Sequence, residues 1–214
     1  MRHKGVNKDE TRLRVTDAIS RGFRKHGFAG VGVDALAKGA GVTSGAFYSH
    51  FGSKSGAFEV ALGVGLDEVI SGIPHYQREF GANWVKAFVD YYLGKAHRED
   101  LECGCAMASL TPEVVRAGTD MQAVFEEKMN VIVDIVARGL EAENHAAARA
   151  RAWAMLAVLI GGLNLARAVQ CRTTIGELAN AIAAAAVAAA GPSCIVKDLT
   201  QSAPRAVPGP SSRA

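Results

Sequence analysis

Apolar residues recur every three or four positions along most of the chain, a spacing that gathers them on one face of an α-helix. Alternation of apolar and polar residues, the mark of a half-buried strand, is scarce. The pattern therefore predicts an all-α protein. In the first quarter of the chain it predicts three helices, over residues 8–27, 33–40 and 44–51.

A tight turn is expected between the second and third of these helices. Gly41 suits the left-handed conformation that ends a helix, and Thr43 or Ser44 can cap the next one. Phe47 and Phe51 are four residues apart and share the face expected to be buried. The outer face then carries small or hydrogen-bonding residues: Ser44, Gly45, Tyr48 and Ser49. Two helices joined in this way are typical of a helix-turn-helix, whose second helix lies in a DNA major groove.

Long amphipathic segments continue through the rest of the chain. Ser53 is expected to cap a helix with Lys54 in its first turn. The helix over residues 106–117 is either interrupted at Pro112 or restarts there with Thr111 as its cap, since proline is tolerated in a first turn. The other helices are expected over residues 78–95, 119–140, 146–169 and 174–190.

The later helices carry start and stop signals. Capping boxes are expected at Thr119 with Gln122 and at Thr174 with Glu177. Gly191, followed by a proline, stops the last helix. Proline, glycine and serine then dominate, so residues 192–214 are predicted to be a disordered tail.

Charge is distributed unevenly along the chain. Residues 1–54 hold ten lysine and arginine residues against four acidic residues, a net charge of +6, whereas the whole chain carries +3. The remainder is therefore slightly acidic. A basic segment at one end only is what attraction to DNA phosphates requires, although a solvated surface with chance asymmetry would give the same count.

The first quarter of the chain holds a set of residues whose type, order and spacing together form a specific pattern: Phe23, Gly27, Phe28, Val33, Leu36, Ala37, Ala40-Gly41-Val42, Gly45, Phe47-Tyr48, His50-Phe51 and Ser53-Lys54. By these residues it resembles the N-terminal domain of the TetR family of transcriptional regulators. Gly32 departs from the family pattern, which usually has a serine or threonine cap there, and Ser55-Gly56 replaces the usual acidic-apolar pair.

This resemblance implies a division of labour along the chain. Residues 1–53 would form the helix-turn-helix DNA-binding domain, and residues 54–191 a helical domain for effector sensing and dimerisation. The last two long helices would pair with those of a second subunit, giving a homodimer that binds a palindromic operator. Repression is the expected mode of action. The alternative is that both helices are simply core.

The resemblance also assigns residues to the DNA contact. Tyr48, His50 and Lys54 would hold phosphates. Thr43 and Ser44 would approach base edges or phosphates. Gly45 and Ala46 would leave room for a close fit.

Gly104-Cys105 in the second domain resembles the Gly-Cys pair of a TetR subgroup, and some members of that broader group respond to thiol-reactive electrophiles or oxidants through this cysteine. By that resemblance Cys105 would be a sensor thiol at a helix N-terminus, where the helix dipole favours the reactive thiolate. The alternatives are a buried structural cysteine and a metal site formed by Cys103, Cys105 and His97, which lacks a fourth ligand nearby in sequence.

A reversible small-molecule effector is the other possibility for this domain. Helical domains of this kind hold apolar pockets between their helices. The same residues would otherwise be ordinary core. The candidate wall residues are Phe88, Tyr92, Met107, Phe125 and Trp153.

Sequence motifs exclude most enzyme classes. The chain lacks a phosphate-binding glycine loop, a Gly-x-Ser-x-Gly elbow and a His-Glu-x-x-His pair. We therefore expect no catalytic residues, no cofactor and no metal. The competing interpretation is a helical-bundle enzyme or a metal- or cofactor-binding protein that does not bind DNA.

The chain is expected in the cytoplasm and outside the membrane. The N-terminus is charged and lacks the apolar core of a signal peptide. The longest apolar run, residues 153–163, is too short to span a bilayer. Four cysteines without a secretory signal favour free thiols in a reducing compartment.

Overall fold

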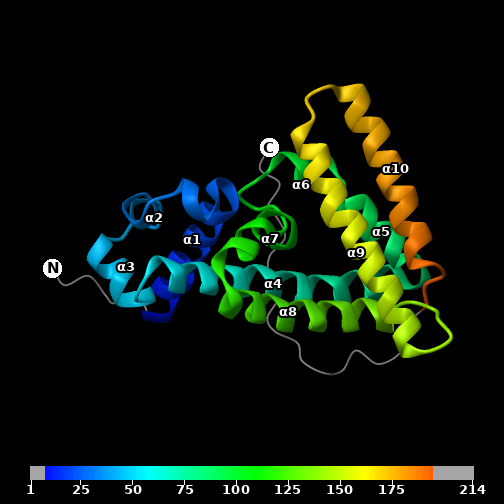
Figure 1. The fold of residues 1–214 in the computed structure, drawn as a ribbon, viewed down its shortest axis with the longest axis horizontal. Helices are drawn as coiled ribbons and strands as arrows, with labels where there is room; N and C mark the ends of the chain where they lie inside the picture. Colours follow the sequence, from blue (N-terminus) through cyan, green and yellow to red (C-terminus); the bar gives the residue numbers. More distant parts are fainter. Residues whose placement is uncertain (1–7, 195–214) are drawn as a thin grey trace.

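The computed structural model describes residues 8–194, which fold into ten α-helices and one short 3-10 helix, with no β-strand in that range (Figure 1). This confirms the all-α prediction. The predicted tail lies outside the described residues from 195 onward. The helices are α1 (Lys8–Gly30), α2 (Val33–Gly39), α3 (Ser44–Phe51), α4 (Lys54–Phe80), η1 (Gly81–Asn83), α5 (Trp84–Tyr92), α6 (Lys95–Glu99), α7 (Ala106–Ala117), α8 (Thr119–Arg138), α9 (His145–Ala168) and α10 (Arg172–Ala190).

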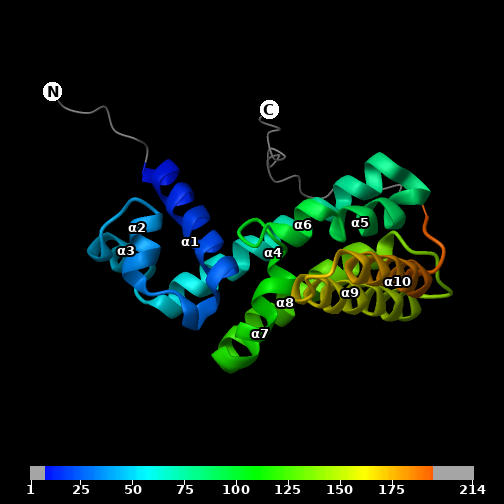
Figure 2. The ribbon, with the colours of Figure 1, turned by 90° about the horizontal axis from the view of Figure 1, so that it is seen from above.

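Helices α1 to α3 form a head at one end of the molecule, and α4 runs from this head into the body (Figure 1, Figure 2). Three aromatic rings fasten the end of α1 to α4: Phe23 stacks on Phe28, and both meet the edge of Phe58 at centroid distances of 5.3 Å. Gly27, with φ of 70°, kinks α1 and allows the chain to turn Phe28 beneath the head. The predicted helix end at Gly27 corresponds to this kink.

The body is built on α4 and α8, which lie side by side, with α9 and α10 as an antiparallel pair at the far end (Figure 1). The α9–α10 contact is the most extensive between any two described helices. Gly162 permits it, because a Cβ at this position would lie 2.4 Å from Cγ2 of Ile182 on α10. Its neighbour Gly161 has open space around it.

We therefore expect Gly162→Ala to lower the free energy of unfolding by about 1–2 kcal/mol, because overpacking outweighs the gain in helix propensity. Gly161→Ala is the matched control, and it should raise stability by roughly 0.5–1 kcal/mol. Urea unfolding followed by circular dichroism measures both changes. Equal effects of the two substitutions would contradict the close α9–α10 contact.

Several predicted helix boundaries were wrong. The segment predicted as one helix over residues 78–95 is divided, because α4 extends to Phe80 and Gly81, with φ of 52°, turns the chain into η1. Helix α6 was missed. Helix α7 continues through Pro112 without restarting, and the Thr111 hydroxyl donates to the Met107 carbonyl within the helix and does not cap a new one.

Neither predicted capping box forms. Gly118, with φ of 93°, precedes α8, and no side chain caps that helix. Helix α10 begins two residues before Thr174, with Cys171 at its cap position. Gly191, with φ of 67°, ends α10 as predicted.

Helices α9 and α10 are 24 and 19 residues long and are apolar enough to cross a membrane by length and composition alone. The apolar run over residues 153–163 is shorter than a bilayer span, but the helix that contains it is long enough to cross one. The same composition is found in core helices of globular proteins. Buried leucines on α9 face the interior here, so length and composition do not decide between the two interpretations.

Candidate nucleic-acid interface

The turn between α2 and α3 has the geometry that the sequence predicts. Gly41 takes a φ of 68°, and the Thr43 hydroxyl accepts a hydrogen bond of 3.1 Å from the Ala46 backbone N–H. Thr43 is therefore the cap of α3, which settles the choice between it and Ser44. Phe47 is fully buried beneath α3, and Phe51 packs beside it at 5.2 Å between ring centroids.

The outer side of α3 is exposed and carries few bulky groups. Tyr48 is 50% exposed, with the edge of its ring against Phe47. A Cβ at Gly45 would meet only the hydroxyl of Thr43, at 3.9 Å, so the backbone there is open to close approach. His50 lies at the far end of the helix, beside Phe51.

Lys54 begins α4 just after this helix. The Ser53 side chain caps α4 as predicted, accepting from the Gly56 N–H at 2.9 Å. The ammonium of Lys54 lies 4.5 Å from the centre of the Phe28 ring. This cation–π contact orients the positive charge on the head.

One contact in the turn was not foreseen from the sequence. The Ser44 hydroxyl donates a 2.6 Å hydrogen bond to Asp34 at the start of α2. Asp34 lies in the first turn of α2, where an acidic side chain suits the positive end of the helix dipole. Asp34 is ten residues from Ser44 in the sequence, and the two side chains meet only because the turn brings the start of α3 back to the start of α2.

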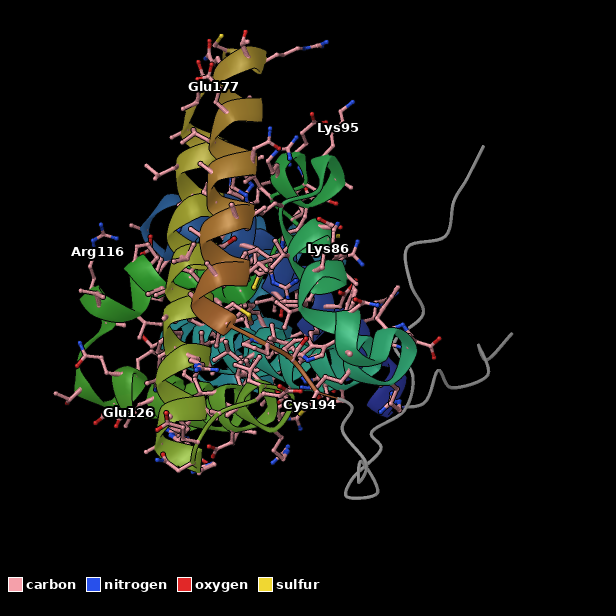
Figure 3. All side chains as sticks on the ribbon, turned by 90° about the vertical axis from the view of Figure 1, so that its right-hand side faces the viewer. Lys86, Lys95, Arg116, Glu126, Glu177 and Cys194 are labelled. Atoms are coloured by element: carbon pink, nitrogen blue, oxygen red, sulfur yellow. The ribbon has the colours of Figure 1, made fainter. Side chains whose placement is uncertain are left out.

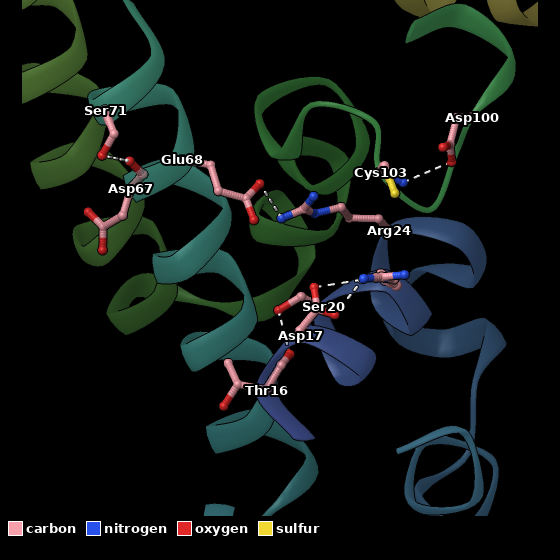
Figure 4. A network of polar contacts seen from close by, with 10 residues as sticks. Thr16, Asp17, Ser20, Arg24, Asp67, Glu68, Ser71, Asp100 and Cys103 are labelled. Atoms are coloured by element: carbon pink, nitrogen blue, oxygen red, sulfur yellow. Dashed lines mark hydrogen bonds and ion pairs between the residues drawn. The ribbon is translucent and has the colours of Figure 1, made fainter. Parts of the chain in front are cut away.

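A second unforeseen feature is the buried joint between α1 and the body (Figure 4). Arg24 of α1 has only 5% of its side chain exposed and donates to Glu68 of α4 at 2.7 Å. Beside it, Lys25 pairs with Glu102 in the loop before α7 at 2.5 Å. The signal in the sequence was a row of polar residues at intervals of four on α1, buried in the structure: Thr16, Ser20 and Arg24.

Cys105 lies at the first turn of α7, as the sensor hypothesis requires, but it is buried, with 8% of its surface exposed. Burial raises the pKa of its thiol, against smaller opposing effects of hydrogen bonds from Tyr92 and from backbone N–H groups. The protein in this conformation therefore holds Cys105 as a neutral thiol. Burial and the nearby Asp100 also raise the pKa of Cys103.

Cys171 has the opposite environment. It is exposed at the start of α10, where hydrogen bonds from the backbone and side chain of Thr174 and from Thr173 lower its thiol pKa to about 6. A thiolate at neutral pH in an accessible position is the condition for reactivity. No local pattern in the sequence indicates this environment, because the helix starts two residues earlier than predicted.

At pH 7 we therefore expect iodoacetamide to alkylate Cys171 at least about tenfold faster than Cys105, because only Cys171 combines exposure with a lowered pKa. Peptide mass spectrometry over a time course measures both sites in one sample. In the Cys171→Ser variant the fast reaction should be missing. Labelling of Cys105 before Cys171 would show that the loop around Cys105 opens readily.

The predicted effector pocket is closed in this structure. Phe88, Tyr92 and Met107 are buried in the core, and Phe125 is partly buried. Trp153, the other residue predicted to line the pocket, is 40% exposed on α9 in the single chain, because the helix turns it away from the face that buries Ala152 and Leu156.

Two surface hollows lie elsewhere. One, of about 400 Å³, lies between α1, α2 and the loop around Glu102, and Arg14 and His26 contribute to its wall. The other, of about 330 Å³, lies between α5 and α10. Among the described residues, no three histidine, cysteine or acidic side chains gather to hold a metal ion.

Comparisons with known proteins agree with this geometry. Residues 15–61 match the model of bacterial regulatory proteins of the tetR family. No curated protein matches the chain.

Solved structures are similar over most of the chain. The reduced form of NemR from E. coli has 17% identity and a TM-score of 0.69 and covers 85% of this chain and 98% of its own. A TetR-family regulator from Agrobacterium tumefaciens has 16% identity, a TM-score of 0.68 and coverage of 83% and 98%. One from Cytophaga hutchinsonii has 19% identity, a TM-score of 0.65 and coverage of 86% and 96%. The N-terminal domain therefore belongs to the tetR family of bacterial regulatory proteins, and the described chain has the fold of that family's transcriptional regulators.

Proposed function

We propose that this protein is a repressor that binds a palindromic operator in double-stranded DNA as a homodimer. The observation that carries the proposal is the exposed, Thr43-capped helix α3 on a basic head. Its N-terminal turn, residues 43–46, would face base edges and nearby phosphates. Tyr48, His50 and Lys54 would bind phosphates on either side.

The homodimer is supported by the outer surface of α9 and α10. Trp153 and Leu165 on α9 and Val187 on α10 are exposed apolar residues. Figure 3 shows α10 in front with α9 beside and partly behind it, and the charged side chains that it labels around this pair include Glu126 on α8 and Glu177 near the start of α10. An apolar centre with a charged rim is the usual anatomy of a protein interface. A two-fold axis there would present two copies of α3 to successive major grooves.

Release from DNA would follow from a change in the body, caused by a small molecule or by modification of Cys105. The route to the head is α4, which begins at Lys54 and continues as one helix to Phe80. The Arg24–Glu68 pair ties α1 to the same helix. A shift of α4 would therefore move the whole head and alter the spacing of the two recognition helices. Because Cys105 is buried, the thiol route requires the loop before α7 to open first.

The DNA contact is tested by gel shift on a duplex selected from random DNA. We expect Tyr48→Phe to weaken binding by about tenfold, because it removes one phosphate hydrogen bond and leaves the packing against Phe47 intact. Lys54→Gln should have a similar effect and reduce the salt dependence by one phosphate contact.

The matched control for these variants is Lys95→Gln, an exposed lysine on α6 of the body and outside the head. It should bind the duplex as the native protein does, and all variants should show the native circular dichroism spectrum. Unchanged affinity in both Tyr48→Phe and Lys54→Gln would remove this assignment. Failure of the native protein to bind any duplex in dilute buffer would remove the proposed function.

A further inference from the structure

We propose that Ser44 and Asp34 act together as a pair of hydrogen-bond acceptors that selects a base with an exocyclic amino group at one position of each operator half-site. Cytosine is preferred at this position, and adenine is the second choice. This inference rests on the proposed function, because it names the base class that α3 reads. It comes from one contact, the 2.6 Å hydrogen bond between the two side chains.

The direction of that hydrogen bond is fixed by chemistry. An ionised carboxylate has no proton to give, so the Ser44 hydroxyl must donate to Asp34. The single hydroxyl hydrogen is then occupied, and the Ser44 oxygen can only accept. The second oxygen of the Asp34 carboxylate can also only accept. A serine that is normally able to donate or accept is thereby restricted to one role.

The pair is positioned at the DNA-facing turn. Ser44 is the first residue of α3, and Asp34 is the second residue of α2, exposed to solvent. Among the side chains that the structure describes, Asp34 forms no ion pair within 4.0 Å. Gly45, next to Ser44, leaves the backbone open to close approach. Both oxygens are therefore free to meet a partner from outside.

Thr43 complements this arrangement. Its hydroxyl oxygen accepts from the Ala46 N–H, which leaves its hydrogen available for a phosphate oxygen. The two adjacent hydroxyls thus differ in role: Thr43 donates outward and Ser44 accepts. Phosphates, which only accept, are suited to Thr43 and not to the Ser44–Asp34 pair.

In the major groove, the groups that donate are the N4 amino group of cytosine and the N6 amino group of adenine. Guanine and thymine present acceptors at the corresponding positions, and these would repel the pair. A carboxylate favours the cytosine N4 group in particular. Asp34 also repels phosphates, so it should weaken binding to unrelated DNA and sharpen the choice of site.

The experiment selects duplexes from a random pool with the native protein and with three full-length variants. The native protein should enrich cytosine or adenine at one position of each half-site, with guanine and thymine about tenfold less frequent. Ser44→Ala should reduce the preference at this position, because it removes one acceptor of the pair and the hydroxyl that holds Asp34, and it should keep the preference at other positions. Asp34→Asn should also reduce the preference at this position, because the amide can donate to Ser44 and release its hydrogen, and it should bind unrelated DNA more tightly.

Ser49→Ala is the matched control, since Ser49 is a second serine on α3, is exposed, and has no hydrogen bond to Asp34. It should keep the preference at this position. A second measurement uses the selected duplex with that cytosine replaced by the analogue that lacks the 4-amino group, or that adenine by purine. The native protein should lose about tenfold in affinity, and Ser44→Ala should lose clearly less than the native protein.

The outcomes separate the inference from the proposed function. Three results would each overturn the acceptor pair and leave DNA binding intact. The enriched sites could carry guanine or thymine at every position, or Ser44→Ala could enrich the same sites as the native protein. The native protein could also bind equally well when the amino group is missing. If no duplex is enriched at low salt, the proposed function fails, and the inference fails with it.

Discussion

Acidification from pH 6.5 to pH 4 is expected to lower the free energy of unfolding by about 3 kcal/mol through His97 alone. His97 is 9% exposed, and burial, followed by the positive charge of Arg167, lowers its pKa to about 4. Arg24 acts in the same direction and Asp100 opposes it. The Nε2 atom is buried without a hydrogen-bond partner, so a proton there gains no acceptor.

The sign follows from the two pKa values. Between about pH 6.5, where the unfolded histidine titrates, and about pH 4, the unfolded chain binds a proton that the folded chain does not. Stability is therefore full above pH 6.5 and is lost as the pH falls through this window. The aromatic neighbours Tyr91 and Tyr92, at 5.1 and 5.0 Å between ring centroids, offer no compensating charge.

Urea unfolding at fixed protein concentration, repeated between pH 7.5 and pH 4, measures this effect. Other groups also titrate in this range, so the informative quantity is the difference between native protein and His97→Phe, which should favour the variant by about 3 kcal/mol more at pH 4 than at pH 7.5. Substitution of the exposed His75 by Gln should leave the native slope in place. Parallel pH profiles for native protein and His97→Phe would refute the assignment.

Glu68→Ala is expected to destabilise the fold by about 2–3 kcal/mol, because it leaves the Arg24 guanidinium buried without a counterion. The value is at the low end for a broken buried pair because Glu68 itself is 43% exposed. The reverse change should be much milder. Arg24→Met fills the same space with an apolar side chain and leaves Glu68 at the surface, where water can solvate it, at a cost of about 1 kcal/mol or less.

This asymmetry is measured by thermal or urea unfolding of the two variants and of Arg24→Met/Glu68→Ala, which should resemble Arg24→Met. Asp90→Ala, which breaks the exposed pair with Lys86, should change stability by less than about 0.5 kcal/mol. Equal losses for Glu68→Ala and Arg24→Met would show that the guanidinium gains little from the pair. Glu68→Ala and Arg24→Met also test whether the Arg24–Glu68 pair transmits a change in the body to the head. Each of the two variants should alter the release of the operator by any effector found.

The head could be predicted closely because its signals are local. Gly41 has the positive φ that the turn requires, and Thr43 and Ser53 form the caps that the sequence predicts. Each of these choices depends on backbone conformation within a few residues. Phe47 is buried by the same local logic, since helix periodicity alone places it opposite Tyr48.

In the body, competing local signals were decided by packing. Pro112 reads as an interruption, yet α7 continues through it. Thr119 and Thr174 are predicted to start capping boxes, yet Gly118 and Cys171 occupy the cap positions of the two helices there. A cap contributes on the order of 1 kcal/mol, which the burial of an apolar helix face exceeds.

The chemical environments of the cysteines and of Trp153 also differ from the sequence-based expectation, because they depend on how the helices pack. Cys105 stands at a helix start as expected, but its reactivity depends on solvent access, and burial raises its pKa. Cys171 had no motif and has the lowered pKa. Trp153 follows helical spacing but faces outward, because its neighbours on α9 supply the buried stripe.

The sequence by itself determined the all-α class, the position of the helix-turn-helix and the caps at Thr43 and Ser53, because these follow from backbone preferences and spacing within one or two turns. Only the tertiary structure decided that Ser44 meets Asp34, that Arg24 is buried against Glu68, and which cysteine is both exposed and lowered in pKa. Contacts between distant segments and the loss of water around a group depend on how helices pack, and no local pattern specifies either.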